Sequence, residues 1–198
     1  MTKILFSLSL ILLVSGCKNP LNQYTSQKYY DAGGKAEKQG DYQLAQQSYS
    51  RALINSRLGG VDKEMETLSL YELSRVTGYL GDYKKSEKGF LEVIELSKSP
   101  ESKNLNIPAL CELARLYFDT KEYQQSLPIF LEANRKLEAL GIEKEDPLGY
   151  CLFLEDYKIA LEKTGDLEGA TKILKKLEEI KIKNPNAKPL FVPKRYTE

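Results

Sequence analysis

The residues from about 71 to 134 carry one pattern twice, about forty residues apart. The first copy reads YELSR at residues 71–75 and FLE at 90–92; the second reads CELAR at 111–115 and FLE at 130–132. A unit of this length cannot bury an apolar face alone, so successive units must stack on one another. The repeat therefore limits the chain to folds built from stacked units.

A short turn divides each unit. The turns read GDY at 40–42 and 81–83, KEY at 121–123 and GDL at 165–167, with spacings of 41, 40 and 44 residues. Apolar residues at three- and four-residue spacings flank every turn, which indicates amphipathic helices rather than strands. A Gly ends the first helix in the left-handed conformation, and the Asp after it accepts hydrogen bonds from the N–H groups that open the second. The sequence predicts four helix hairpins.

These hairpins resemble the tetratricopeptide repeat (TPR). A small residue precedes each of the first three turns, at Gly33, Ser74 and Ala114, and a small residue followed by a ring or branched side chain comes after each turn. The match covers about residues 26–183, with units longer than the standard repeat of roughly 34 residues and similar to those of kinesin light chains. The resemblance implies an all-α, right-handed superhelical solenoid. Lys158 takes the small position of the fourth unit, which we therefore expect to be degenerate or to act as a cap.

The start of the sequence resembles the leader of a bacterial lipoprotein. An apolar run over residues 4–14 is too short to span a bilayer comfortably and ends in LVSGC, which is similar to a lipobox. This resemblance implies a signal peptide over 1–16 and a diacylated Cys17 that opens a tether over 17–25. Lys18 stands where an Asp would favour the inner membrane, so we expect an outer-membrane anchor. An ordinary signal peptide and an uncleaved anchor are the alternatives.

The composition disfavours several classes of function. The chain contains no His and no Trp, and 29 Lys and Arg balance 28 Asp and Glu. His is the commonest general base and metal ligand, and the sequence has no Walker loop, dinucleotide fingerprint, zinc-spaced Cys pair or nucleophile elbow. We expect a non-catalytic protein with no metal, no cofactor and no nucleic-acid partner.

In TPR proteins, the first helices of successive hairpins line a concave groove. Carried over by position, the resemblance implies a peptide-binding groove at Tyr30, Tyr71, Arg75, Tyr79, Cys111, Arg115, Phe118, Asp119, Glu155, Glu162 and Lys163. Aromatic and Arg side chains supply much of the binding energy at interfaces. The expected partner is therefore a protein or peptide.

Arg75 and Arg115 hold equivalent positions in neighbouring units. Both could share a carboxylate of a bound segment, or each could pair with the Glu three residues earlier, Glu72 or Glu112, and both arrangements could hold at once. We expect neither Arg to contribute much to folding, because exposed helix pairs contribute little.

Two further expectations concern the cysteines and the end of the sequence. Cys111 and Cys151 lie at different phases on helices whose axes stand about 8–10 Å apart, so two half-buried thiols are favoured over a disulfide. Residues 184–198 form a Pro-rich, basic tail, which either lies against the final helix through Leu190, Phe191 and Val192 or is loose.

Together these features predict a membrane-anchored interaction scaffold, with a role in envelope or appendage assembly. A surface-displayed binder of host or environmental ligands is the alternative. An enzyme would have to work with carboxylates, Lys or Tyr alone, and we disfavour it because repeat folds of this kind usually serve as binding scaffolds.

Overall fold

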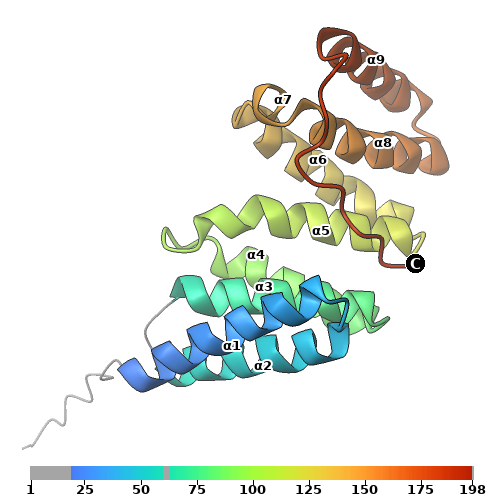
Figure 1. Ribbon diagram of the computed structural model, residues 1–198. Coiled ribbons are helices and arrows are strands. Elements are labelled where there is room, and N and C mark those ends of the chain that lie inside the picture. Colours follow the sequence, from blue (N-terminus) through green and yellow to red (C-terminus); the bar gives the residue numbers. More distant parts are fainter. Residues whose placement is uncertain (1–18, 60–62, 198) are drawn as a thin grey trace, which may run out of the picture.

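The computed structural model describes residues 19–59 and 63–197, and every regular element in these ranges is helical. The long helices pair as α1 (Pro20–Lys38) with α2 (Tyr42–Gly59), α3 (Lys63–Tyr79) with α4 (Tyr83–Leu96), α5 (Asn106–Asp119) with α6 (Tyr123–Ala139), and α8 (Pro147–Thr164) with α9 (Leu167–Lys183). The hairpins stack in sequence order (Figure 1), with the 3₁₀ turn η1 (Lys103–Leu105) and the short helix α7 (Ile142–Glu145) in the joints. The all-α solenoid of four hairpins is confirmed.

Residues 1–16 and Cys17, on which the expected signal peptide and lipid anchor depend, lie outside the described residues. Among the residues that the structure describes, none of the helices is both long and apolar enough to cross a bilayer.

Three of the four turns have the predicted chemistry. Gly40, Gly81 and Gly165 have left-handed φ angles of 78°, 86° and 88°, and the Asp after each accepts a hydrogen bond from the backbone N–H three residues later. The third turn differs, because Lys121 takes a φ of 64° and the Glu122 side chain makes no capping hydrogen bond. A residue with a Cβ pays about 1–2 kcal/mol for this conformation.

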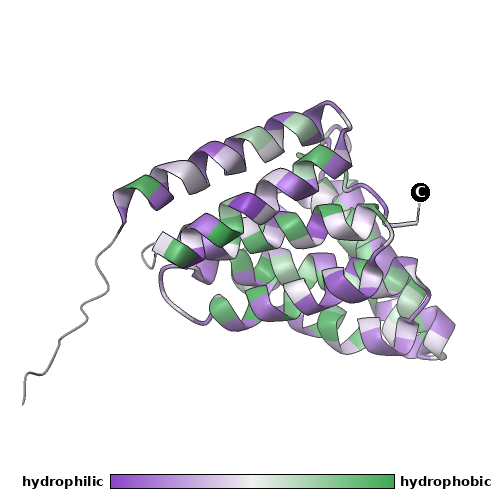
Figure 2. Ribbon diagram, turned by 90° about the horizontal axis from the view of Figure 1, so that it is seen from below, coloured by the Kyte–Doolittle hydropathy of each residue, from purple (hydrophilic) through white to green (hydrophobic). Residues whose placement is uncertain are grey.

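The apolar faces of the helices meet in three stacked clusters. One joins α1, α2 and α3 around Tyr49, one joins α2 to α5 around Phe90, and one joins α5, α6, α8 and α9 around Phe130. Figure 2 shows hydrophobic and hydrophilic residues alternating along each helix, as this packing requires. Phe90 and Phe130, the rings that follow the second and third turns, are 0% and 1% exposed and lie in the core.

The first helix begins earlier than predicted. Asn19 accepts a hydrogen bond from the N–H of Leu21, and Pro20 occupies the first turn, where its missing N–H costs nothing. Helix α1 therefore takes up most of the segment that we expected to be a tether over 17–25.

The fourth hairpin is complete rather than degenerate. Lys158 does not enter the space between α8 and α9; its side chain pairs with Glu162 at 2.8 Å. Leu154, Tyr157 and Leu161 bury the inner face of α8 instead. Lys158 is accommodated by this pairing along α8, so the fourth unit is not degenerate, and the alternative that it acts as a cap stays a prediction.

Candidate protein-binding groove

The expected groove residues fall into different surroundings. Tyr30, Arg75 and Tyr79 line a pocket of about 730 Å³ between α1 and α3, the N-terminal pocket. Cys111, Arg115 and Glu155 line a second pocket of about 480 Å³ between α5 and α8, the C-terminal pocket. The tail residues Phe191 and Val192 border both pockets.

Other members of the expected set lie outside both pockets. Phe118 and Asp119 lie under the tail, as described below, and Tyr71 packs its ring edge-on against Phe90, 6.1 Å between ring centroids. Glu162 and Lys163 line neither pocket. The groove therefore contains only part of the set that the resemblance implied.

Arg75 is held by carboxylates from two helices. Its guanidinium pairs with Glu72 of α3 at 2.7 Å and with Glu37 of α1, and it lies 5.7 Å from the ring centre of Tyr79. Burial disfavours the charged guanidinium, but Glu72 and the neighbouring Tyr79 and Glu37 outweigh burial and raise the pKa of Arg75. Only 15% of this side chain is exposed. The expectation that Arg75 contributes little to folding is therefore wrong, because removing it would leave two largely buried carboxylates unpaired.

Arg115 is similarly enclosed. Its Nη1 lies 2.8 Å from Glu112, and 11% of its side chain is exposed. Both Arg residues thus pair with the Glu three residues earlier, the second of the two arrangements considered. They line pockets, but their charge is already balanced within the solenoid.

The tail, residues 184–197 of the described chain, crosses the groove. It leaves α9 and runs back over α8 and α5 towards the end of α3 (Figure 1). The N–H of Leu190 donates to the side chain of Asp146 at 3.2 Å. Leu190, Phe191 and Val192 are 80%, 60% and 66% exposed, so neither expected arrangement of the tail was right.

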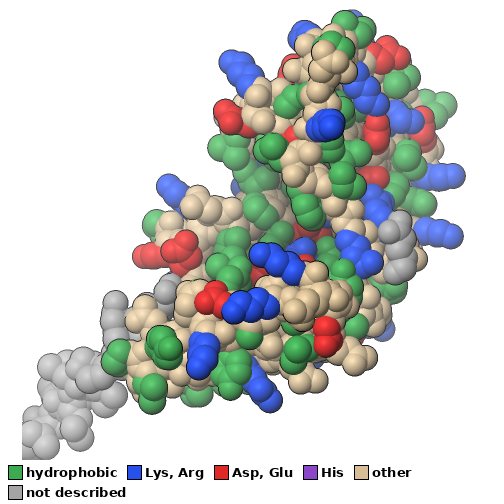
Figure 3. Space-filling view, viewed as in Figure 1, with side chains coloured by type: hydrophobic (Ala, Val, Ile, Leu, Met, Phe, Trp, Pro, Cys, Tyr) green, Lys and Arg blue, Asp and Glu red, His purple; other side chains and the backbone are tan. Residues whose placement is uncertain are grey.

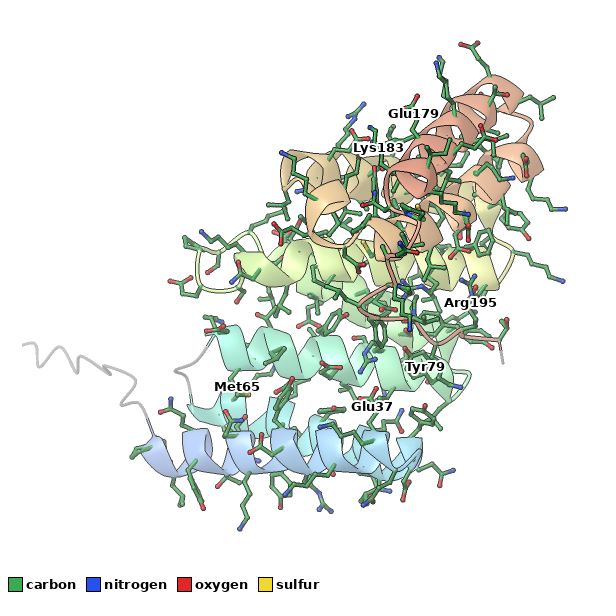
Figure 4. All side chains as sticks on the ribbon, turned by 45° about the horizontal axis from the view of Figure 1, so that its top comes forward. Glu37, Met65, Tyr79, Glu179, Lys183 and Arg195 are labelled. Atoms are coloured by element: carbon green, nitrogen blue, oxygen red, sulfur yellow. The ribbon has the colours of Figure 1, made fainter. Side chains whose placement is uncertain are left out.

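Arg195 attaches the tail to the groove by charge. Its guanidinium donates to Asp156 of α8 at 2.7 Å and to Asp119 of α5, and it lies 5.2 Å from the ring centre of Phe118. Only 3% of the Asp119 side chain is exposed. Figure 4 shows Arg195 of the tail approaching the end of α3, where Tyr79 lies. Figure 3 shows acidic side chains set back among basic and apolar ones on this face.

Tyr196 is buried in the groove, with 2% exposed. Its hydroxyl donates to Glu112 at 2.6 Å, its N–H donates to Asp119 at 2.8 Å, and its carbonyl accepts from the Tyr83 hydroxyl at 3.1 Å. Its ring lies 5.0 Å from that of Tyr79. Burial, with Glu112 nearby, raises the pKa of Tyr196 well above its usual value. The side chain and both backbone polar groups are therefore bonded.

Gly78 makes this placement of Tyr196 feasible. A Cβ at position 78 would come within 2.5 Å of the Tyr196 ring. Sequence reasoning missed Arg195 and Tyr196, although a Gly inside a helix costs about 1 kcal/mol relative to Ala and often indicates a close approach. That signal points to Gly78 but not to the side chain that covers it.

The two thiols are free, as expected. Cys151 is more buried than predicted, at 1% exposed, and Cys111 is partly exposed beside the C-terminal pocket. Burial raises the pKa of Cys111 to about 12. Within the described ranges, no group of three or more Cys, Asp or Glu side chains is arranged to hold a metal.

Two crystal structures of a kinesin-light-chain-like protein with nearly identical TPR-like repeats, from Podosopora anserina, are similar to this chain. They align with TM-scores of 0.62 and 0.61 at 16% sequence identity, covering 82% of this chain and 77% of theirs. This chain has the TPR-like repeat fold. At this identity the likeness shows the fold alone. No family model and no curated protein matches the sequence.

Proposed function

We propose that this TPR-like chain is a non-catalytic scaffold, anchored to the cell envelope by lipid, which presents its groove to an extended segment of a partner protein. The observation that supports this most directly is the tail. The groove holds an extended stretch of polypeptide through two carboxylates, a buried phenol and both backbone polar groups of Tyr196. These are the contacts that a peptide-binding groove offers to a ligand.

The two pockets on either side of the tail supply further room for a partner. The N-terminal pocket presents the Tyr30 and Tyr79 rings beside Arg75, and the C-terminal pocket presents the partly exposed side chains of Ile142 and Leu152 beside Glu155. Aromatic side chains with a few polar groups are typical of binding surfaces. A partner segment longer than the tail could therefore extend into both.

Site-specific photo-crosslinking in cells of the source organism tests the groove. A photoreactive residue replaces exposed Lys35, which lines the N-terminal pocket, and in a matched control replaces exposed Lys88 of α4, which lines neither pocket. We expect a discrete protein adduct at position 35 and none at position 88. Equal adducts at both positions, or none at position 35, would contradict the proposal.

The anchor needs a separate test, because it rests on the sequence around Cys17. Mass spectrometry of the native mature protein should find fatty acids on Cys17, and Cys17→Ala should leave the chain unmodified and released from membranes. An unmodified Cys17 in the native protein would remove the lipid anchor while leaving the groove proposal intact.

A further inference from the structure

Asp119 and Asp156 form a site that the solenoid itself does not neutralise. In the described ranges, Arg195 of the tail is the one cation that pairs with either carboxylate. Arg115, the other cation near Asp156, is engaged by Glu112. Without the tail, two carboxylates would share this part of the groove with no paired cation. The site therefore fits a guanidinium supplied from elsewhere.

The adjoining site for Tyr196 also belongs to the solenoid. Gly78 leaves space for a ring, Glu112 accepts a phenol hydrogen bond, and Tyr83 and Asp119 bond the backbone on either side. We call Glu112, Asp119 and Asp156, with Gly78 and Tyr83, the Arg–Tyr site. It binds an Arg and the Tyr directly after it.

The tail reaches this site through a linker that the Leu190–Asp146 hydrogen bond and the stacking of Lys194 over Tyr42 and Tyr79 hold to the solenoid. Eleven residues, 184–194, separate α9 from Arg195, and Leu190 to Val192 are mostly exposed. A short flexible linker holds its ligand at an effective concentration of about millimolar. A partner segment can displace the tail if its local concentration is higher than this value or if it makes additional contacts in the two pockets.

We propose that the Arg–Tyr site is the specificity site of the groove: it takes a partner segment in which Arg directly precedes Tyr, and this segment binds by displacing the chain's own tail. This inference rests on the proposed scaffold function and adds the chemistry of the ligand. Lys would bond the two carboxylates as a single point charge, and Phe would leave Oε2 of Glu112 without the phenol donor while Arg115 stays on Oε1, so both are weaker ligands.

The probe is a fluorescent peptide of residues 188–197, KPLFVPKRYT. It is titrated by anisotropy into the unchanged chain and into a full chain carrying Arg195→Ala and Tyr196→Ala. We expect at least about tenfold tighter binding to the double variant, because its tail no longer competes. A peptide with Ala for Arg should bind at least about tenfold more weakly, and one with Phe for Tyr a few-fold more weakly.

A matched pair of substitutions then locates the site. Asp156→Asn, added to the double variant, should lower the affinity for the peptide at least about tenfold. Glu168→Gln, on the exposed side of α9, should leave this affinity unchanged. A folded double variant that binds the peptide no more tightly than the unchanged chain would overturn the proposal. An affinity for the peptide that Asp156→Asn leaves unchanged would also overturn it.

A second measurement covers the case in which the double variant does not fold. Excess unlabelled peptide, at several times the effective concentration of about millimolar, is added to the unchanged chain, and hydrogen exchange is followed at Tyr196. We expect its amide to lose protection as it leaves Asp119; unchanged protection at saturating peptide would refute displacement.

The outcomes separate this inference from the scaffold proposal. A partner cross-linked at position 35 whose binding is indifferent to Asp156→Asn would refute the Arg–Tyr specificity and leave the scaffold. Dimerisation that the double variant abolishes would identify a second copy's tail as the segment bound, in support of the inference.

Discussion

The two halves of the groove pair their charged side chains and fill the space beside a glycine with different parts of the chain. In the N-terminal half, Arg75 lies between Glu37 and Glu72, and the ring of Tyr49 packs on Gly33 of its own hairpin. In the C-terminal half, Asp119 and Asp156 pair with Arg195 of the tail, and the next residue, Tyr196, packs back on Gly78 of α3. One half is completed by adjacent helices and the other by the tail.

This difference separates permanent contacts from exchangeable ones. Glu37, Glu72 and Arg75 are all carried by the helices α1 and α3, whereas Arg195 and Tyr196 belong to the tail, which is part of no helix. Stability should therefore depend strongly on the first cluster and weakly on the second, and the following experiments test this contrast.

The largest effects should come from the cores beneath both halves. Phe90→Ala and Phe130→Ala each remove a ring that is at most 1% exposed, and we expect each to lower the free energy of unfolding by about 3–5 kcal/mol. Chemical denaturation followed by circular dichroism measures the loss. A much smaller cost for one Phe would show that its half is loosely packed.

The sharpest contrast is between Arg75→Ala and Arg195→Ala. Loss of Arg75 should cost about 3 kcal/mol, because Glu37 and Glu72 would stay largely buried without their cation. Loss of Arg195 should cost only about 1 kcal/mol, because the tail can leave and water can then reach Asp119 and Asp156. Equal costs in thermal or denaturant unfolding would mean that the tail is as permanent as α1.

The turn beside Asp119 offers a stabilising change that leaves the tail contacts intact. Lys121 has the left-handed backbone that Gly40, Gly81 and Gly165 provide at the other turns. Lys121→Gly should raise the free energy of unfolding by about 1 kcal/mol, with Gly81→Ala lowering it as the matched reverse change. Unfolding curves of both variants measure the pair, and a destabilised Lys121→Gly would show that the turn is not strained.

The smallest effect concerns Cys111, which lines the C-terminal pocket next to Arg195. Burial raises the pKa of Cys111 to about 12. The protonated thiol therefore contributes fully to the free energy of unfolding below the usual thiol pKa of about 8.5, and this contribution is lost as the pH rises from about 8.5 to about 12. At pH 8 the thiol is therefore almost entirely protonated, and alkylation by iodoacetamide should be slow.

Releasing the tail should accelerate this alkylation if the tail shields the pocket. The double variant Arg195→Ala, Tyr196→Ala should react faster at Cys111, while Cys151, which is 1% exposed on α8, serves as the internal control. Peptide mapping by mass spectrometry reads both sites. Identical rates with and without the tail contacts would show that the tail does not control access.

Local chemistry made most of the fold predictable. The Gly-Asp turns and the apolar spacings specify helix ends and buried faces within a few residues, and Phe90 and Phe130 follow from that pattern. The start of α1 differs from the prediction because Asn19-Pro20 begins a helix, with Asn as the cap and Pro in the first turn, within a segment whose composition is typical of a linker. Lys158 was misjudged because position in a repeat does not fix which way a side chain turns.

The groove was only partly predictable, since its completion is not local. Tyr79 and Asp119 could be placed by repeat position, but nothing in their surroundings in sequence indicates that Arg195 and Tyr196 lie on them. The burial of Arg75 likewise depends on Glu37, 38 residues away in the previous hairpin. Periodicity reports which face of a helix is buried, not which distant residue covers it.

The tail also changes how the molecule can assemble. Repeat arrays rely on contacts between adjacent units, but Tyr196 bonds Glu112 and Tyr83 across 84 and 113 residues of chain. Such distant contacts form late, because the intervening chain must first be ordered. Whether the polypeptide leaves a ribosome or a translocation pore, residues 195 and 196 emerge after every helix that they contact. In each new molecule the helices of the groove are thus synthesised before its own tail, so a partner of the kind proposed would meet a groove that the tail has not yet covered.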